Sequence, residues 1–197
     1  MTNKKPAEVI ARLVADRAKR TDQELLSELK ALKPLPPELS DAWSSDATWA
    51  KAHLFVALAD LAAKRKLRAA APLLLERASL GDPGEMMRGL RHSLEKIFKP
   101  DWPALTQVCI TQLQSGPAGA RLWALDQLGV LRDPKSLEAI LARLTDEQAE
   151  VREFARQAAV MLCDGEAGLA ATAIKALEVA NARVPGEADD ALRDLER

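Results

Sequence analysis

The sequence contains no tyrosine and few other aromatic residues, with four tryptophans and three phenylalanines among 197 positions. Aromatic and β-branched side chains are typical of strands, whereas alanine and leucine favour helices. Alanine and leucine dominate here, only nine glycines occur, and no segment alternates apolar and polar residues with the period of a strand. These features predict an all-α fold with an aliphatic core.

Cysteine is also scarce. Cys109 and Cys163 lie far apart, each within an apolar helical pattern, as buried free thiols usually do. This placement argues against a disulfide framework. A cysteine nucleophile would need an exposed thiol in an electropositive pocket, so we also predict no nucleophile.

Histidine and glycine provide no recognisable reactive site. His53 and His92 lie on separate predicted helices, without cysteines or paired carboxylates at metal-ligand spacing. The glycines fall at turns and never form a phosphate-binding loop between a strand and a helix. We therefore expect no catalytic residue, no metal and no cofactor, and hence a protein that is not an enzyme.

Long hydrophobic runs are absent. The stretch 69–75 is among the longest and reaches only about a third of the roughly 20 residues that cross a bilayer. Charged residues are scattered through the first twenty positions and leave no apolar stretch for a secretory signal. These observations predict a cytoplasmic protein without a membrane partner.

Neither sign of charge predominates, since 28 Lys and Arg face 29 Asp and Glu. The distribution is uneven: residues 1–115 hold 18 basic and 14 acidic side chains, and residues 116–197 hold 10 and 15. The chain is therefore positive toward its start and negative toward its end. Neither half has the concentrated basic stripe of a nucleic-acid-binding domain.

The N-terminal region predicts a helical hairpin over residues 6–33. Thr21 and Glu24 have the spacing of a capping box, and the leucines that follow lie three and four residues apart on one helical face. Prolines and serines then interrupt the helical pattern up to residue 45. We place a boundary there, with an N-terminal part over 1–45 and a repeat region over 46–197.

Beyond this boundary, turn signals recur at short, regular intervals, and Asp or Thr often stands where a helix would begin. The expected helices are Thr48–Lys66, Leu67–Ser79, Pro83–Phe98, Trp102–Gln114, Ala118–Leu131, Pro134–Leu144, Gln148–Cys163, Glu166–Ala182 and Glu187–Leu195.

The first helices of successive pairs align with one another. The aligned blocks are His53-Leu54-Phe55, Arg88-Gly89-Leu90, Arg121-Leu122-Trp123 and Arg152-Glu153-Phe154. They begin at positions 53, 88, 121 and 152, so successive blocks lie 35, 33 and 31 residues apart. Two helices in a period of this size are typical of an α-solenoid.

Two stretches carry a resemblance to a known family. They are Arg121-x-x-Ala124-x-x-x-Leu128-Gly129-x-Leu131-x-Asp133-Pro134 and Leu144-x-Asp146 followed by Val151-Arg152-x-x-Ala155. This pattern resembles the HEAT repeat, especially the short bacterial type named after phycobilisome lyases.

The resemblance implies a right-handed α-solenoid of about four helical hairpins, with an N-terminal hairpin packed on it and a C-terminal capping helix. The expected units are 48–80, 83–115, 117–145 and 147–182, with the cap at 186–197. Similar repeats pair the aspartate of a turn with the arginine of a neighbouring unit, which here implies a pair between Asp133 and Arg152.

The repeat architecture favours a non-enzymatic scaffold or adaptor that binds another protein on its curved surface. Second helices usually build the concave wall of such a surface. The outward residues that we expect to contact a partner are Arg68, Arg77, Gln107, Thr111, Arg143 and Lys175.

Two alternatives remain at this point. The basic run of Lys64, Arg65, Lys66 and Arg68 could contact phosphate in a nucleic-acid-binding protein similar to HEAT-type DNA-alkylation-repair enzymes. Cations also collect at the ends of helices because they complement the helix dipole. The other alternative, a bilin lyase or chaperone-type factor, follows from the resemblance alone.

Overall fold

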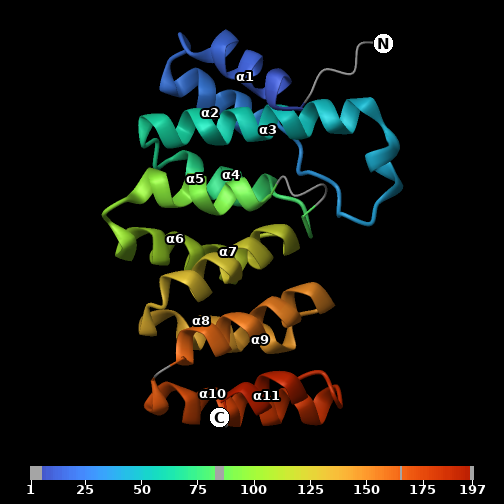
Figure 1. The fold of residues 1–197 in the computed structure, drawn as a ribbon, viewed down its shortest axis with the longest axis vertical. Coiled ribbons are helices and arrows are strands. Elements are labelled where there is room, and N and C mark those ends of the chain that lie inside the picture. The colour runs from blue at the N-terminus through green and yellow to red at the C-terminus, as the bar shows by residue number, and fades with distance from the viewer. Residues whose placement is uncertain (1–5, 83–86, 165, 196–197) are drawn as a thin grey trace. The chain divides into compact units, whose positions relative to one another are not determined.

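Helices make up all the regular structure in the described part of the chain. The computed structural model describes residues 6–82, 87–164 and 166–195, and no strand occurs in these ranges (Figure 1). The prediction of an all-α fold is confirmed. The chain forms two compact units, residues 1–105 and 106–197.

The first unit is built around one long helix, α3 (Asp46–Arg65), which packs against α1, α2, α4 and α5. The other elements that begin in this unit are α1 (Pro6–Arg17), α2 (Asp22–Ala31), the 3₁₀ helix η1 (Asp41–Ser44), α4 (Ala70–Arg77), α5 (Arg88–Phe98) and α6 (Trp102–Ser115). The buried side of α3 carries Phe55, Leu58 and Leu61 among small alanines, so neighbouring helices can approach closely. The expected N-terminal hairpin is present as α1 and α2.

The start of α2 confirms the capping box. The Thr21 side chain accepts a hydrogen bond from the Glu24 backbone N–H, and the Glu24 carboxylate accepts one from the Thr21 N–H. Two of the backbone donors that a helix start leaves unpaired are thereby satisfied.

The connection after α2 is held by specific hydrogen bonds. The N–H groups of Leu35 and Glu38 donate to the carbonyls of Arg77 and Leu80. The half-buried Trp43 and Trp49 rings lie edge to face with centroids 5.1 Å apart, and the Trp43 Nε1–H donates to a backbone carbonyl of the same connection. These contacts order a segment that the sequence predicts to be irregular.

The second unit is centred on α9 (Ala149–Cys163), which packs against α7, α8, α10 and α11. Its other elements are α7 (Ala118–Leu131), η3 (Pro134–Ser136), α8 (Leu137–Leu141), η4 (Ala142–Thr145), α10 (Ala167–Arg183) and α11 (Asp189–Leu195). Trp123 of α7 lies edge to face with Phe154 of α9, centroids 6.3 Å apart. Gly129 lets the same two helices meet, because a Cβ there would lie 3.1 Å from the Ala158 Cα.

The helix expected over Pro134–Leu144 is divided into η3, α8 and η4. Asp133 caps its start by accepting a hydrogen bond from the Lys135 N–H, and Pro134 occupies the first helical position. The final turn tightens into the 3₁₀ form and ends at Asp146, which has extended backbone. The prediction of one continuous helix was therefore wrong, because both ends of this short element adopt the tighter 3₁₀ geometry.

Among the described residues, no helix combines the length and the apolar character that crossing a membrane requires.

Candidate functional site

A buried ion pair joins α7 to the turn before α9. Arg121 Nε and Nη2 each donate to an Asp146 carboxylate oxygen at 2.8 Å, and the Asp146 side chain is only 2% exposed. Asp146 also accepts a hydrogen bond from the Gln148 N–H, and Arg121 donates to the carbonyl of Gly116. The Asp146 carboxylate therefore binds Arg121 of α7 and also caps the turn before α9.

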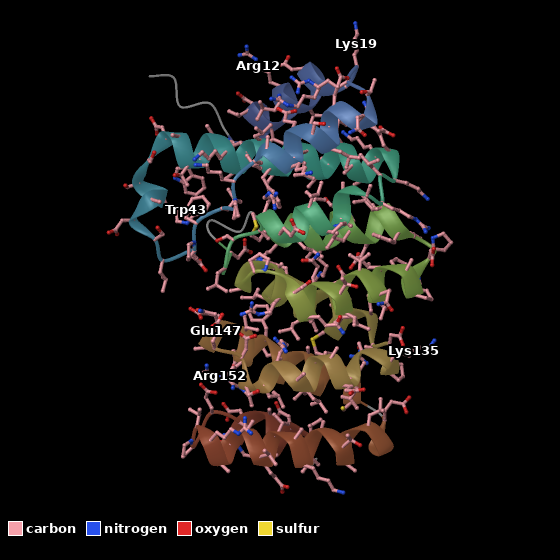
Figure 2. All side chains as sticks on the ribbon, turned by 180° about the vertical axis from the view of Figure 1, so that it is seen from behind. Arg12, Lys19, Trp43, Lys135, Glu147 and Arg152 are labelled. Atoms are coloured by element: carbon pink, nitrogen blue, oxygen red, sulfur yellow. The ribbon has the colours of Figure 1, made fainter. Side chains whose placement is uncertain are left out.

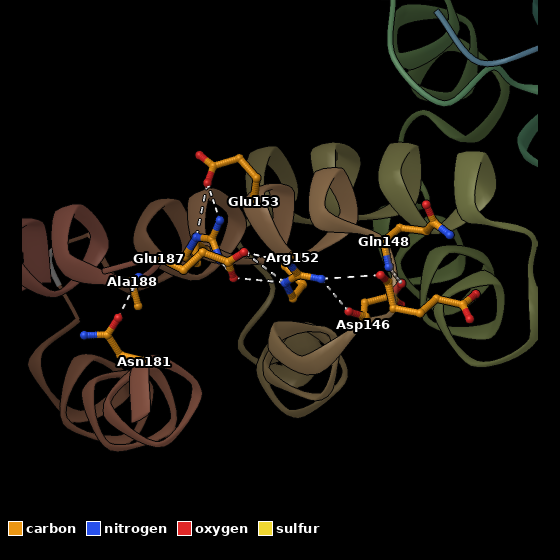
Figure 3. A network of polar contacts seen from close by, with 9 residues as sticks. Asp146, Gln148, Arg152, Glu153, Asn181, Glu187 and Ala188 are labelled. Atoms are coloured by element: carbon orange, nitrogen blue, oxygen red, sulfur yellow. Dashed lines mark hydrogen bonds and ion pairs between the residues drawn. The ribbon is translucent and has the colours of Figure 1, made fainter. Parts of the chain in front are cut away.

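A second arrangement of this kind joins α9 to the segment before α11 (Figure 3). Arg152 of α9 donates through Nε and Nη2 to Glu187, at 2.9 and 2.6 Å, and through Nη1 to the backbone carbonyl of Asp146. Arg156 donates to the same Glu187 at 2.9 Å and to Glu153 at 2.6 Å. Glu187 thus bridges two arginines one helical turn apart.

The expected pair between Asp133 and Arg152 does not form. Asp133 caps η3, and Arg152 binds Glu187, which comes before α11. Arg121 and Arg152 thus each bind a carboxylate that precedes a later helix, Asp146 before α9 and Glu187 before α11. The expected partner of Arg152 was therefore wrong, because Glu187 and not Asp133 provides the carboxylate.

These contacts shift the pKa values of both carboxylates. The hydrogen bond from Arg152, with those of Arg156 and the charges of both arginines, outweighs partial burial and lowers the pKa of Glu187 to about 2. Burial opposes ionisation of Asp146. The hydrogen bonds from Arg121 and the Gln148 N–H, with the charges of Arg121 and Arg143, outweigh it and hold the pKa of Asp146 below its usual value. Both groups are ionised at neutral pH.

A groove of about 290 Å³ lies between α6 and α8–η4. It is lined by Ile110, Leu113, Gln114, Lys135, Glu138, Ala139, Ala142 and Arg143. Lys135 projects on the opposite side of the second unit from Glu147 and Arg152 (Figure 2). We call this feature the α6/α8 groove. Its lining combines apolar side chains with basic and acidic side chains.

Of the six residues predicted to contact a partner, only Arg143 lines the α6/α8 groove. Gln107 and Thr111 are exposed on α6, where the Thr111 hydroxyl donates to the Gln107 carbonyl. Lys175 is exposed on α10. All three are exposed, and none of them lines the α6/α8 groove.

The other two, Arg68 and Arg77, lie in the first unit and have partners within it. Arg68 donates to Asp101 at 2.6 Å and lies over the Phe98 ring, 5.3 Å from its centroid. Arg77 donates to Glu76 and to the carbonyl of Lys30.

The remaining members of the basic run also bind groups of the chain itself. Lys64 pairs with Asp60 at 2.7 Å, four residues earlier on the same helix. Arg65 donates to Asp22 and to the carbonyls of Ala18 and Arg20, which lie in and before α2. Lys66 donates to the Lys99 carbonyl. The run therefore ties α3 to its neighbours within the first unit.

A second groove, of about 360 Å³, lies between α9 and α11, and the sequence did not predict it. Its lining comprises Glu153, Arg156, Gln157, Val160, Met161, Glu187, Asp190, Ala191 and Asp194. The sequence feature that could have indicated this groove is a pair of acidic residues four positions apart on the last helix, Asp190 and Asp194. Only the packing of that helix on α9 shows that they share a cavity with Met161.

The surroundings of both thiols oppose their ionisation, and those of the His53 imidazole oppose its protonation. Cys109 and Cys163 are buried, as predicted, and burial raises the pKa of both thiols. Desolvation lowers the pKa of His53, whose ring lies 6.3 Å from that of Trp49. Within residues 6–82, 87–164 and 166–195, no group of three or more His, Cys, Asp or Glu is placed to hold a metal ion.

No family model matches the chain, and neither a curated protein nor a solved structure does.

Proposed function

We propose that this protein is a non-enzymatic scaffold or adaptor of HEAT-like helical repeats, which binds a segment of another protein in the α6/α8 groove. The observation that carries the proposal is the lining of that groove. Ile110, Leu113 and Ala139 provide apolar surface, and Lys135 and Glu138 place charges of opposite sign beside it. Protein interfaces combine an apolar centre with a polar rim in this way.

Arg143 is the residue of this groove that we expect to orient the partner. Its side chain is 29% exposed and donates through Nη1 to Asp146 at 3.4 Å. A carbonyl or carboxylate of a bound segment can accept a further hydrogen bond from this guanidinium, and hydrogen bonds from a charged donor are stronger than those between neutral groups.

Recurrence of the arginine–carboxylate contact supports a solenoid of about four HEAT-like hairpins. Arg121 and Arg152 lie in the first turns of α7 and α9, and each binds an acidic residue that precedes a later helix, α9 and α11 respectively. Contacts repeated between neighbouring units are typical of repeat proteins. We propose that the aligned blocks that begin at positions 53 and 88 belong to two further hairpins of the same kind.

A protein partner fits this groove better than nucleic acid does. Binding to phosphate depends on several cations that are free to neutralise it. Every basic member of the run at 64–68 has a partner within the first unit, and the lining of the α6/α8 groove includes an acidic side chain, Glu138, as well as Lys135 and Arg143.

The test is affinity capture by the full chain from lysate of its source cells, with a nuclease-treated half and an untreated half compared. One variant exchanges the groove charges, Lys135→Glu with Glu138→Lys. A matched control exchanges an exposed ion pair on α1, Arg12→Glu with Asp16→Arg. Both preserve net charge, and thermal unfolding verifies that both fold.

We expect a stoichiometric protein to be retained by the unmodified chain and by the α1 control, and to be lost from the groove variant. Recovery of nucleic acid alone from untreated lysate would overturn the proposal. A protein captured equally by all three would also overturn the assignment to this groove.

A further inference from the structure

The groove between α9 and α11 combines an apolar lining with acidic side chains. We call it the α9/α11 groove. Val160 is half-buried, Ala191 is buried, and Met161 is 38% exposed. Methionine adapts its shape to varied partners, so an exposed methionine beside a groove suits a surface that receives another side chain.

The one guanidinium in this groove is already engaged. Arg156 is 8% exposed and donates to both Glu153 and Glu187. Its positive charge is therefore compensated within the wall. The lining contains four carboxylates and this single guanidinium. Arg152 binds Glu187 and Arg193 pairs with Asp190, so an excess of negative charge remains and favours cations.

The acidic side chains on α11 reach solvent. Asp190 is 90% exposed and pairs with Arg193, which is itself 65% exposed, and Asp194 is exposed one helical turn later. Exposed ion pairs contribute little free energy and exchange readily. A basic group of a partner can thus replace Arg193 beside Asp190 at small cost.

Acidic residues also predominate in the part of the sequence that forms this groove. Residues 146–195 contain eleven acidic and five basic side chains. A negative field over this area accelerates association with a positive partner and disfavours an acidic one.

We propose that the α9/α11 groove binds a basic amphipathic helix of another protein. Lysine and arginine have an aliphatic stem and a charged head. The stem of one such residue would lie against Val160 and Met161 while its head contacts Asp190 and Asp194. This surface is separate from the α6/α8 groove and does not rest on that proposal.

The test measures binding of the full chain to a fluorescein-labelled peptide of leucine and lysine, about 16 residues long, enough for four helical turns. Fluorescence polarisation is read at moderate salt. Asp190→Asn with Asp194→Asn removes two negative charges from the groove. Glu166→Gln with Glu178→Gln removes two from exposed positions outside it. Met161→Gln makes the lining polar with little change in size.

We expect the Asp190/Asp194 variant to weaken binding by about tenfold, and Met161→Gln by about fivefold, because the charged head and the stem both contribute. The Glu166/Glu178 control should change affinity less than about twofold. A leucine–glutamate peptide should not bind detectably.

Three outcomes would overturn the proposal. The first is equal weakening by groove and control variants, which would indicate unspecific attraction to negative charge. The second is no peptide binding to a chain whose thermal unfolding shows that it is folded. The third is concentration-dependent self-association that the Asp190/Asp194 variant abolishes, which would assign the groove to a second copy of this chain.

Discussion

At the scale of single residues, Asp146 and Glu147 show how strongly location determines the value of a charge. They are adjacent, and both contact Arg121, at 2.8 and 3.3 Å. The Asp146 side chain is 2% exposed, whereas that of Glu147 is 76% exposed. Water therefore screens the pair between Arg121 and Glu147, but not the buried pair between Arg121 and Asp146.

We therefore expect Asp146→Asn to lower the free energy of unfolding by about 3 kcal/mol, because it leaves Arg121 without its buried counter-charge. The matched variant Glu147→Gln should lower it by less than about 0.5 kcal/mol. Urea denaturation of both variants provides the comparison. Equal losses would show that Arg121 does not depend on Asp146.

Gln127 of α7 is a second informative residue. It is fully buried, and neither atom of its side-chain amide has a hydrogen-bond partner among the described residues. Since an unpaired buried amide is costly, Gln127→Met should raise the free energy of unfolding by about 1 kcal/mol. Chemical denaturation tests this, with the exposed Gln107→Met as a control expected to change little. A clear loss for Gln127→Met would contradict the prediction.

At the scale of elements, helix ends depend on residues that adopt unusual backbone angles. Lys66 ends α3 and Arg132 ends α7, both in the left-handed region with φ of 52°. Glycine adopts this conformation without steric cost, whereas other residues do so at a cost of about 1 kcal/mol.

Arg132→Gly should therefore stabilise the protein by up to about 1 kcal/mol. The variant loses only the exposed ion pair between Arg132 and Asp164, which contributes little. Arg132→Ala loses the same pair but keeps the strained angle, so it should stabilise nothing. Thermal unfolding of the two variants separates the backbone effect from the charge effect.

Helix positions could be predicted from sequence, but helix partners could not. Thr21, Glu24 and Pro134 act locally, so their signals correctly indicated starts. The partner of Arg152 lies 35 residues away, and several carboxylates compete at that separation. Its choice depends on how α11 packs on α9, which a local pattern does not contain.

The candidate grooves were harder to predict for the same reason. Each joins side chains from separate helices. Arg143, one of the residues predicted to contact a partner, lines the α6/α8 groove, but the prediction did not include the apolar side chains beside it. Arg68 and Arg77 looked like outward cations because their partners, Asp101 and Glu76 with the carbonyl of Lys30, are defined only after folding.

At the scale of the whole molecule, stability should depend on pH through the buried network of the second unit. The pKa of Glu187 falls from its usual 4.5 to about 2, and that of Asp146 is also lowered. A lowered pKa contributes stability above the usual pKa, and this contribution is lost as protons bind.

We expect the free energy of unfolding to be constant near neutral pH and to decrease between about pH 5 and 2. Glu187 should account for on the order of 1 to 2 kcal/mol of this decrease in the free energy of unfolding, since nearby solvent weakens its ion pairs. Glu187→Gln should be less stable at pH 7 and should show a shallower decrease. Urea denaturation at a series of pH values measures both. A parallel decrease in the two proteins would exclude Glu187 as a source.

The distribution of aromatic residues makes the chain its own optical reporter. Without tyrosine, intrinsic ultraviolet emission arises from tryptophan alone, and Trp123 is the only tryptophan between 106 and 197. It is 6% exposed, so its emission should shift to longer wavelength when the second unit unfolds. In a variant in which phenylalanine replaces Trp43, Trp49 and Trp102, the emission wavelength would report the unfolding of that unit alone, without an attached dye.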